Sequence, residues 1–295
     1  MHMEWRLLDL GGLDPYGAQT LYEAVASVVG RRLTPNTLIL CYPVSPYVCI
    51  GFHQEVDKEV DIEFCRRSNL PIIRRSQGGG AVYLDSDQQF YQVVARRDDP
   101  AVPASVEELF RKFLKPTIHT YNRLGLAAEY KPVNDVVVGG KKISGNGAGE
   151  LEDAAILVGN IILDINYDSM TRVLKVPNEK FRDKLSKSMK EWVTSLKKEL
   201  GYVPHRDRIK QLLIEGYSEI GINLRAGKLS DDERRIYDLK VKPRHLSDEW
   251  LCMPRLRHPR LMDRRAVKIS EGVQVVEADY KARKMIRVTA EVASD

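Results

Sequence analysis

Residues 74–83 decide the fold, and they read Arg74-Arg75-Ser76-Gln77-Gly78-Gly79-Gly80-Ala81-Val82-Tyr83. Three consecutive glycines between two β-rich segments cost backbone entropy, so a ligand or a close approach must require them. Glycine backbone can turn several N–H groups toward an anion, and the two arginines add forked donors suited to phosphate or carboxylate. The spacing matches neither a Walker A loop nor a dinucleotide-binding fingerprint. We predict a phosphate- or adenylate-binding loop, and a tight strand connection with incidental arginines is the alternative.

A second motif lies downstream, where Asn134-Asp135 precedes Lys141-Lys142-Ile143-Ser144-Gly145-Asn146-Gly147-Ala148-Gly149. Gly139-Gly140 between two short apolar segments predicts a two-residue β-hairpin that brings Asp135 and Lys142 to one cavity. A carboxylate is a ligand that Mg²⁺ prefers, and a held lysine stabilises phosphate or a developing oxyanion. The small residues after Lys142 leave room for a substrate chain. A solvated lysine beside a turn is the alternative.

The wider pattern predicts an α+β fold in which mixed β-sheets are flanked by helices. Asp14-Pro15 marks the start of a helix that stops at Gly30, and Ser105 caps a helix that runs to Leu124 with a kink at Pro116. Apolar β-rich runs surround these helices, whereas residues 167–239 are mostly helical. We expect a catalytic domain over residues 1–251, a basic Pro/Arg linker over 252–265 and a short β-rich appendage over 266–295.

The composition is that of a globular protein, with 43% hydrophobic and 29% charged residues and a net charge of +5. No apolar run approaches a membrane span, and the first residues do not resemble a signal peptide, so we expect a cytoplasmic protein. Cys41, Cys49, Cys65 and Cys252 form no C-x-x-C pair. We interpret Cys41 and Cys49 as small core residues, and a catalytic cysteine is the sharper alternative.

Basic residues gather in two places, within 180–198 and between Cys252 and Lys268. The second segment holds six basic residues against one acidic residue: Arg255, Arg257, Arg260, Arg264, Arg265 and Lys268 against Asp263. A solvated surface is one interpretation, and a cationic face for an acidic macromolecular partner is the other. Nucleic acid is not expected, because interleaved aromatic residues and a groove-reading helix are absent from the sequence.

These motifs together resemble the lipoate–protein ligase A family within the biotin/lipoate ligase fold, and its archaeal-like two-piece branch in particular. The resemblance covers Trp5 to about Met253. It depends on Ile50-Gly51-Phe52-His53-Gln54, on the two motifs above, and on the segment from Val173 to Lys184. Leu84 stands where the family commonly has His, and Gly147 where many members have Ala, which leaves the preferred acyl chain open.

The resemblance implies an ATP-dependent ligase that forms lipoyl-AMP from lipoic acid and then acylates a lysine of a carrier domain. Lys142 matches the catalytic lysine, Asp135 the acid linked to Mg²⁺, and Arg74 and Arg75 the arginines near lipoate and phosphate. The remaining residues expected to bind lipoyl-AMP are Gly78, Gly79, Gly80, Ala81, Val82, Tyr83, Asn134, Gly145, Gly147 and Ala148. The implied partners are a lipoyl carrier domain, such as the glycine cleavage H protein or a 2-oxoacid dehydrogenase E2, and a separate accessory protein.

The alternative function is an octanoyl or lipoyl transferase of the same fold that uses a preformed acyl donor. Some such enzymes use a cysteine nucleophile, and neither motif contains a cysteine, so the ligase is our prediction. Biotin ligase is not expected, because its Gly-Arg-x-Gly-Arg loop is missing.

Overall fold

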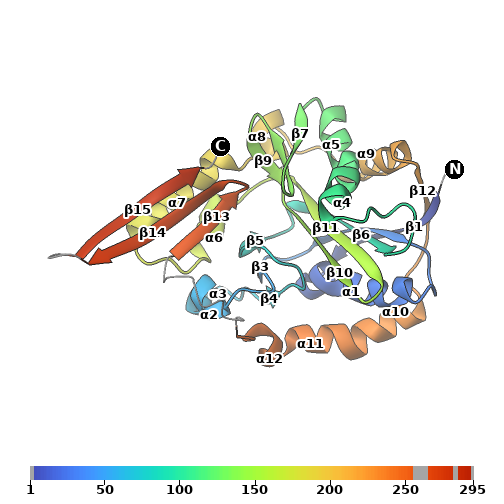
Figure 1. The fold of residues 1–295 in the computed structure, drawn as a ribbon, viewed down its shortest axis with the longest axis horizontal. Coiled ribbons are helices and arrows are strands. Elements are labelled where there is room, and N and C mark those ends of the chain that lie inside the picture. Colours follow the sequence, from blue (N-terminus) through green and yellow to red (C-terminus); the bar gives the residue numbers. More distant parts are fainter. Residues whose placement is uncertain (1–2, 255–264, 282–284, 294–295) are drawn as a thin grey trace.

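The computed structural model describes residues 3–254, 265–281 and 285–293. Its centre is a six-stranded mixed sheet (Figure 1). The strands, in spatial order, are β10 (Asn146–Leu151), β11 (Ala154–Ile162), β6 (Gln88–Arg96), β2 (Thr37–Pro43), β1 (Met3–Leu13) and β12 (Ile222–Ala226). β1 runs parallel to both of its neighbours, and the other pairs are antiparallel. The predicted α+β class is confirmed.

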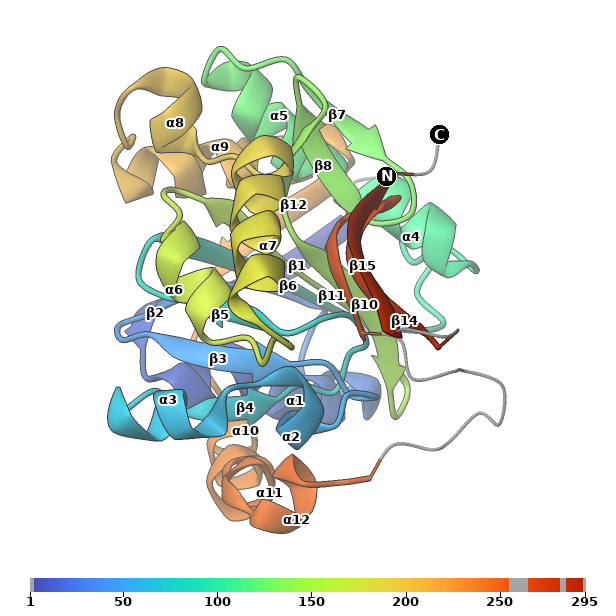
Figure 2. The same ribbon diagram turned by 90° about the vertical axis from the view of Figure 1, so that its left-hand side faces the viewer.

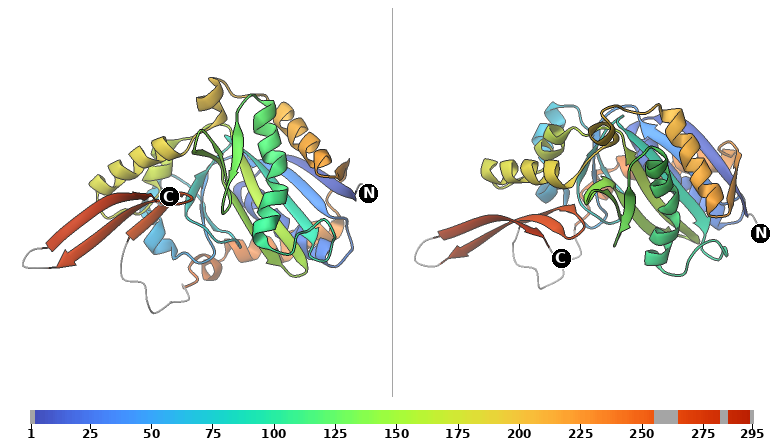
Figure 3. Two further views of the ribbon diagram at one scale, coloured as in Figure 1. Left: turned by 45° about the horizontal axis from the view of Figure 1, so that its top comes forward. Right: turned by 90° about the horizontal axis from the view of Figure 1, so that it is seen from above.

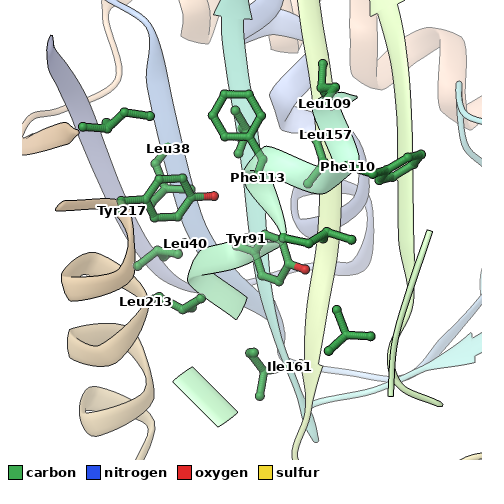
Figure 4. Close-up of a cluster of buried hydrophobic side chains, with 14 of the residues drawn as sticks. Leu38, Leu40, Tyr91, Leu109, Phe110, Phe113, Leu157, Ile161, Leu213 and Tyr217 are labelled. Atoms are coloured by element: carbon green, nitrogen blue, oxygen red, sulfur yellow. The ribbon is translucent and has the colours of Figure 1, made fainter. Parts of the chain in front are cut away.

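Helices cover both faces of this sheet. On one face lies α1 (Pro15–Gly30), whose Tyr22, Val25 and Val29 are buried against the strands. On the other face lie α4 (Val106–Phe113), α5 (Lys115–Arg123) and α9 (Arg206–Glu219). Their apolar side chains meet the strands in the largest core cluster, which Figure 4 shows around Tyr91 and Tyr217. Helices packed on both faces therefore hold the six-stranded sheet in place, and it supports the segments that flank it.

The bounds of α1 agree with the prediction because its ends carry local signals. Asp14 accepts hydrogen bonds from Tyr16 N and Gly17 N, and Pro15 fills the first turn, where no N–H is needed. The predicted helix from Ser105 to Leu124 is divided instead into α4 and α5 around Leu114. Pro116 lies in the first turn of α5, so the proline begins a new helix rather than bending a continuous one.

Two three-stranded sheets flank the platform and carry the two sequence motifs. One contains β4 (Ile72–Arg74), β3 (Tyr47–Ile50) and β5 (Val82–Leu84), and the other contains β7 (Ala128–Lys131), β8 (Asp135–Val138) and β9 (Lys141–Ser144). The predicted hairpin is confirmed between β8 and β9, where Gly139 and Gly140 both have positive φ, at 54° and 77°. This backbone conformation favours glycine and fits a two-residue hairpin turn.

Short helices complete the main body. They are α2 (Val56–Glu59), α3 (Ile62–Arg67), α6 (Tyr167–Arg172), α7 (Glu179–Trp192), α8 (Leu196–Leu200), α10 (Asp231–Ile236), the π-helical turn η1 (Tyr237–Val241), α11 (Lys242–Leu246) and α12 (Asp248–Leu251). Among the described residues, no helix is both long and apolar enough to cross a membrane.

The appendage forms a third small antiparallel sheet of β13 (Arg265–Ser270), β14 (Val273–Lys281) and β15 (Met285–Ala293). It lies beside α7, as Figures 2 and 3 show. Val267 and Val275 are buried in one cluster with Phe181 and Leu185 of that helix. The β-rich character predicted for the tail is confirmed. Most of the predicted linker, residues 255–264, lies outside the described residues, and the domain boundaries stay predictions.

Candidate active site

The hairpin of β8 and β9 brings the predicted lysine and aspartate together. Lys142 Nζ lies 2.6 Å from Asp135 Oδ1, so the two side chains form an ion pair. The Asp135 side chain is fully buried, whereas that of Lys142 is 21% exposed. A buried carboxylate needs a partner, because removing an unpaired charge from water is costly. The pair therefore holds an ammonium group at the edge of the site.

The second oxygen of Asp135 is held by the appendage. Glu271 N, in the turn between β13 and β14, donates a hydrogen bond of 2.8 Å to Asp135 Oδ2. The tail sheet therefore contacts the hairpin of β8 and β9 through a backbone N–H. Within the described residues, Asp135 Oδ1 has the ion pair with Lys142 but no hydrogen bond, whereas Oδ2 accepts from Glu271 N. The link of Asp135 to Mg²⁺ stays a prediction.

Strand β10 connects the lysine hairpin to the glycine loop. A Cβ added at Gly145, just before β10, would lie 3.6 Å from Lys142 Cε, and one added at Gly147 would lie 3.5 Å from Gln77 Cβ. The small residues that the sequence analysis assigned to a substrate channel thus lie between Lys142 and the loop. Asn146 Nδ2 donates to Asn134 O at 2.9 Å, which fixes the start of β10 against the entrance of β8.

The glycine loop folds tightly on the end of β3. A Cβ at Gly51 would lie 2.0 Å from Gly79 O, and Phe52 N donates to Gln77 O at 2.9 Å. Arg75 bends over the loop and donates to Gly78 O and Gly80 O at 2.8 and 2.9 Å. Gly78, Gly79 and Gly80 are exposed, so their backbone is open to a ligand.

Arg74 occupies a different environment from the one predicted. Its side chain is 1% exposed, and its guanidinium donates to backbone carbonyls rather than facing the loop. Nε lies 2.8 Å from Trp250 O, Nη1 2.6 Å from Phe52 O and Nη2 2.8 Å from Leu251 O. Trp250 Nε1 donates in return to Arg74 O at 3.0 Å. In this structure Arg74 holds α12 against β4, because carbonyls of α12 accept from its guanidinium. Its assignment to ligand binding stays a prediction.

A buried polar cluster supports the loop from behind. The Glu23 carboxylate, 2% exposed, accepts a hydrogen bond from Ser76 Oγ at 2.5 Å, lies 3.0 Å from His245 Nε2 and pairs with Arg244. Burial alone would raise the pKa of Glu23, but the hydrogen bond and charge of His245, together with Arg244, outweigh it and lower the pKa. This cluster joins α1, the loop and α11. This cluster was not predicted, although the position of Glu23 within a mostly apolar helix was a signal for it.

The other predicted residues of the glycine motif have packing roles in this structure. Ala81 and Tyr83 pack on the cluster that contains Val48 and Val173, whereas Val82 packs against Tyr47 and Cys49. Ala148 lies on β10 at the edge of the main core. The structure brings Lys142, Asp135, Asn134, Gly145 and Gly147 together, with Gln77 connecting them to the glycine loop.

One of the four cysteines contacts the glycine loop, because Arg75 Nη1 donates a hydrogen bond of 3.5 Å to Cys49 Sγ. Cys41, Cys49 and Cys65 are buried, and Cys252 is exposed. Burial raises the pKa of Cys41 to about 12 and that of Cys65 to about 11, and it also raises the pKa of Cys49. A thiolate is the nucleophilic form of cysteine, so the raised pKa values of Cys41 and Cys65 disfavour that form near neutral pH. The expectation that Cys41 and Cys49 are core residues is confirmed.

Comparison with known proteins identifies the family. The lipoyl protein ligase A/B catalytic domain matches residues 14–218, and the chain belongs to this family. Lipoate-protein ligase A subunit 1 of Thermoplasma acidophilum is 29% identical over 215 residues, which cover 69% of this chain and 79% of the relative. The structure of an archaeal bipartite lipoate protein ligase from the same organism matches with a TM-score of 0.73 and 29% identity, covering 88% of this chain and 100% of that one. The resemblance to the ligase A family and its two-piece branch is confirmed.

Other relatives match over nearly their whole length and correct the predicted function. A chain named octanoyltransferase LipM from Kyrpidia tusciae is 29% identical over 269 residues, covering 83% of this chain and 97% of the relative. A second chain of that name, from Moorella thermoacetica, is 26% identical over 268 residues, covering 84% of this chain and 97% of the relative. The prediction of an AMP-forming ligase is therefore wrong, and these relatives favour the alternative, an acyl transferase.

The close approach of Gly79 O to Gly51 allows a test of whether the glycine loop belongs to the site. Gly51→Ala places a methyl group against Gly79 O, so the loop must shift, and such overpacking typically costs about 1–3 kcal/mol. We expect acyl transfer to fall at least about tenfold, because the loop and β10 lose their alignment. The control is Gly149→Ala, where an added Cβ meets nothing within 4 Å. Equal transfer rates in the two variants would contradict the assignment of the loop to the site.

From the contacts of the Glu23 cluster we expect that substitution of Glu23 lowers the free energy of unfolding. Glu23→Gln removes a buried carboxylate that pairs with His245 and with the partly exposed Arg244, and the weakened hydrogen bonds should lower the free energy of unfolding by about 1–3 kcal/mol. Because the pKa of Glu23 is lowered in the folded state, its contribution is present above the ordinary glutamate pKa and is lost as pH falls below it. Urea unfolding at neutral and acidic pH checks both points. Glu107→Gln, at an exposed pair with Arg111, should change stability by less than about 1 kcal/mol.

Proposed function

We propose that this chain transfers an octanoyl or lipoyl group from a preformed acyl donor to a lysine of a lipoyl carrier domain. Its membership of the lipoyl protein ligase A/B family and the octanoyltransferase names of its long-matching relatives support this proposal. The archaeal ligase structure is described together with its E2 lipoyl domain. A 2-oxoacid dehydrogenase E2 or the glycine cleavage H protein is accordingly the class of acceptor we propose.

The observation that carries the proposal is the ion pair of Lys142 and Asp135 beside a strand of small residues. Asp135 is buried and held from two sides, so Lys142 Nζ has a defined position. Positioned positive charge is most effective where negative charge develops during the reaction, as on the oxygen of a carbonyl under attack. The small residues at the start of β10 leave space for an acyl chain next to that ammonium group.

In the proposed reaction the carrier lysine attacks the donor directly. Its amine nitrogen bonds to the carbonyl carbon of the donor thioester, and the resulting oxyanion lies against the Lys142 ammonium group. The carbon–sulfur bond then breaks, the amine loses a proton and the departing thiolate takes one up, leaving an amide and a free thiol. Three of the protein's four thiols are buried with raised pKa values. This supports transfer without an acyl-cysteine intermediate.

The accessory protein and the ATP and Mg²⁺ requirement stay predictions. The tail sheet supplies a contact to Asp135 from within this chain. The transferase reaction starts from an activated acyl group, so it requires no nucleotide.

A comparison of donors tests the proposal. An unmodified lipoyl domain is incubated with the purified chain and either octanoyl-acyl carrier protein or lipoate with ATP and Mg²⁺, and its intact mass is measured. We expect octanoylation from the thioester donor without nucleotide. Modification in the ATP arm alone would overturn the proposal.

Substitution of Lys142 tests the mechanism. Lys142→Ala should lower the transfer rate by about 10²–10³, the usual loss for a preorganised electrostatic donor. It should also lower the melting temperature, because Asp135 is left buried without its counter-charge, so the rates are compared at a temperature at which circular dichroism shows the variant to be folded. Lys141→Ala, the neighbouring lysine on β9, and Cys252→Ala, the exposed thiol, are matched controls that should keep near wild-type rates. Loss of transfer in Cys252→Ala, with an acylated enzyme in the wild type, would instead show a cysteine route.

A further inference from the structure

A row of lysines lies along the exposed face of α7. Eight basic residues stand between positions 175 and 198 against three acidic ones. Lys180, Lys184 and Lys187 are spaced by four and three residues, so they share one side of the helix. Lys180 and Lys187 are exposed and Lys184 is half-buried. Glu191, one turn further on, ends this lysine row.

The lysine row has no acidic partner in the described parts of the chain, whereas neighbouring cations do. Lys197 Nζ pairs with Asp164 at 2.6 Å, and Arg182 Nε lies 3.4 Å from Glu179. Salt bridges that include Lys180, Lys184 or Lys187 are not found among the described residues. Within the described residues, the positive charge of the row is therefore not neutralised by a salt bridge.

The buried face of α7, which adjoins the row, fixes the row relative to the rest of the molecule. Phe181 and Leu185 are fully buried, and Met189 is 7% exposed. They pack with the main body and the tail sheet, and Trp192 Nε1 donates to Glu291 on β15 at 3.2 Å. The lysine row is thus carried by a helix held on a packed face, and its geometry is set before any partner binds.

The end of α7 contacts the catalytic strand. Thr194 N donates to the carbonyl oxygen of Lys142 at 2.8 Å, and Val193 forms a parallel bridge with Lys142. At about 1.5 Å per residue, Lys187 lies about 9 Å along the chain direction from Val193 and Lys180 about 10 Å further. A small protein domain bound along the row would therefore be large enough to place one of its own surface residues at Lys142.

We infer that the lysine row is the docking surface for an acidic protein domain that presents the acceptor lysine. This inference rests on the proposed function, because the partner must deliver an amine to Lys142. A nucleic acid or a membrane would satisfy the charge but offers no lysine to acylate. Complementary charge within about 8 Å, the screening length at physiological salt, speeds encounter and sets orientation. The face predicted from sequence, Arg255, Arg257 and Arg260, lies outside the described residues.

Charge reversal tests the docking surface. Lys180, Lys184 and Lys187 are changed together to Glu, and the control changes Lys228, Arg234 and Lys240 to Glu, three exposed residues near α10 and η1, at the opposite side of the molecule in Figure 1. The dissociation constant for an unmodified lipoyl domain is measured at low and moderate salt. We expect at least tenfold weaker binding in the row variant at low salt, a flatter salt dependence, and less than twofold change in the control.

The experiment distinguishes failure of the docking surface from failure of the proposed acyl-transfer function. Equal binding by the row variant and the control would overturn the docking surface, and so would a wild-type chain that binds no lipoyl domain. Row-dependent binding without transfer from any acyl donor would leave the docking surface standing and overturn the proposed function. If the triple reversal unfolds by circular dichroism, the corresponding Gln variants remove the charge with less strain, and at least threefold weaker binding is then expected.

Discussion

The buried charge of Asp135 is the constraint on which the site depends. A carboxylate fully removed from water is stable only with a counter-charge and hydrogen bonds. Here Lys142 supplies the first and the backbone of Glu271 supplies a hydrogen bond. The Lys142 ammonium group and the tail sheet are therefore both positioned by contacts with the same carboxylate, that of Asp135. A chain that lacked either partner would leave Asp135 uncompensated, so the lysine is held in place whether or not a substrate is present.

The glycine loop is exposed, but buried polar contacts anchor the residues that precede its glycines. Its glycines are exposed, yet the residues that precede them are anchored: Arg74 in the carbonyls of α12, Ser76 on Glu23, and Gln77 on the hydroxyl of Tyr22 at 2.6 Å. These anchors belong to α1 and to helices near residue 250. The open backbone of the loop is thus supported by buried polar contacts, and positioned dipoles of this kind act on a ligand without reorganising.

Local signals predicted the elements that depend on local chemistry. The cap at Asp14 and the Gly139-Gly140 turn were sufficient for α1 and for the hairpin that joins Asp135 to Lys142. Strand β10 was not expected, because its glycines have weak strand preference and the strand exists through pairing with β11. The role of Arg74 and the partnership of Glu23 with His245, 222 residues apart, depend on which distant segments meet. Spacing in the sequence does not carry that information.

Helix α7 has two faces with different tasks. Its buried face holds the tail sheet, because a small three-stranded sheet needs a packed neighbour to be stable, and Phe181 and Leu185 provide it through Val267 and Val275. Its outer face carries the lysine row. The sheet in turn contacts Asp135 through the backbone N–H of Glu271. This contact requires that the turn be correctly placed, but it does not depend on the side chain at position 271. The helix that carries the lysine row therefore also packs against the sheet whose Glu271 N–H is the second partner of Asp135. Among the described residues, this backbone contact connects the appendage to the candidate site.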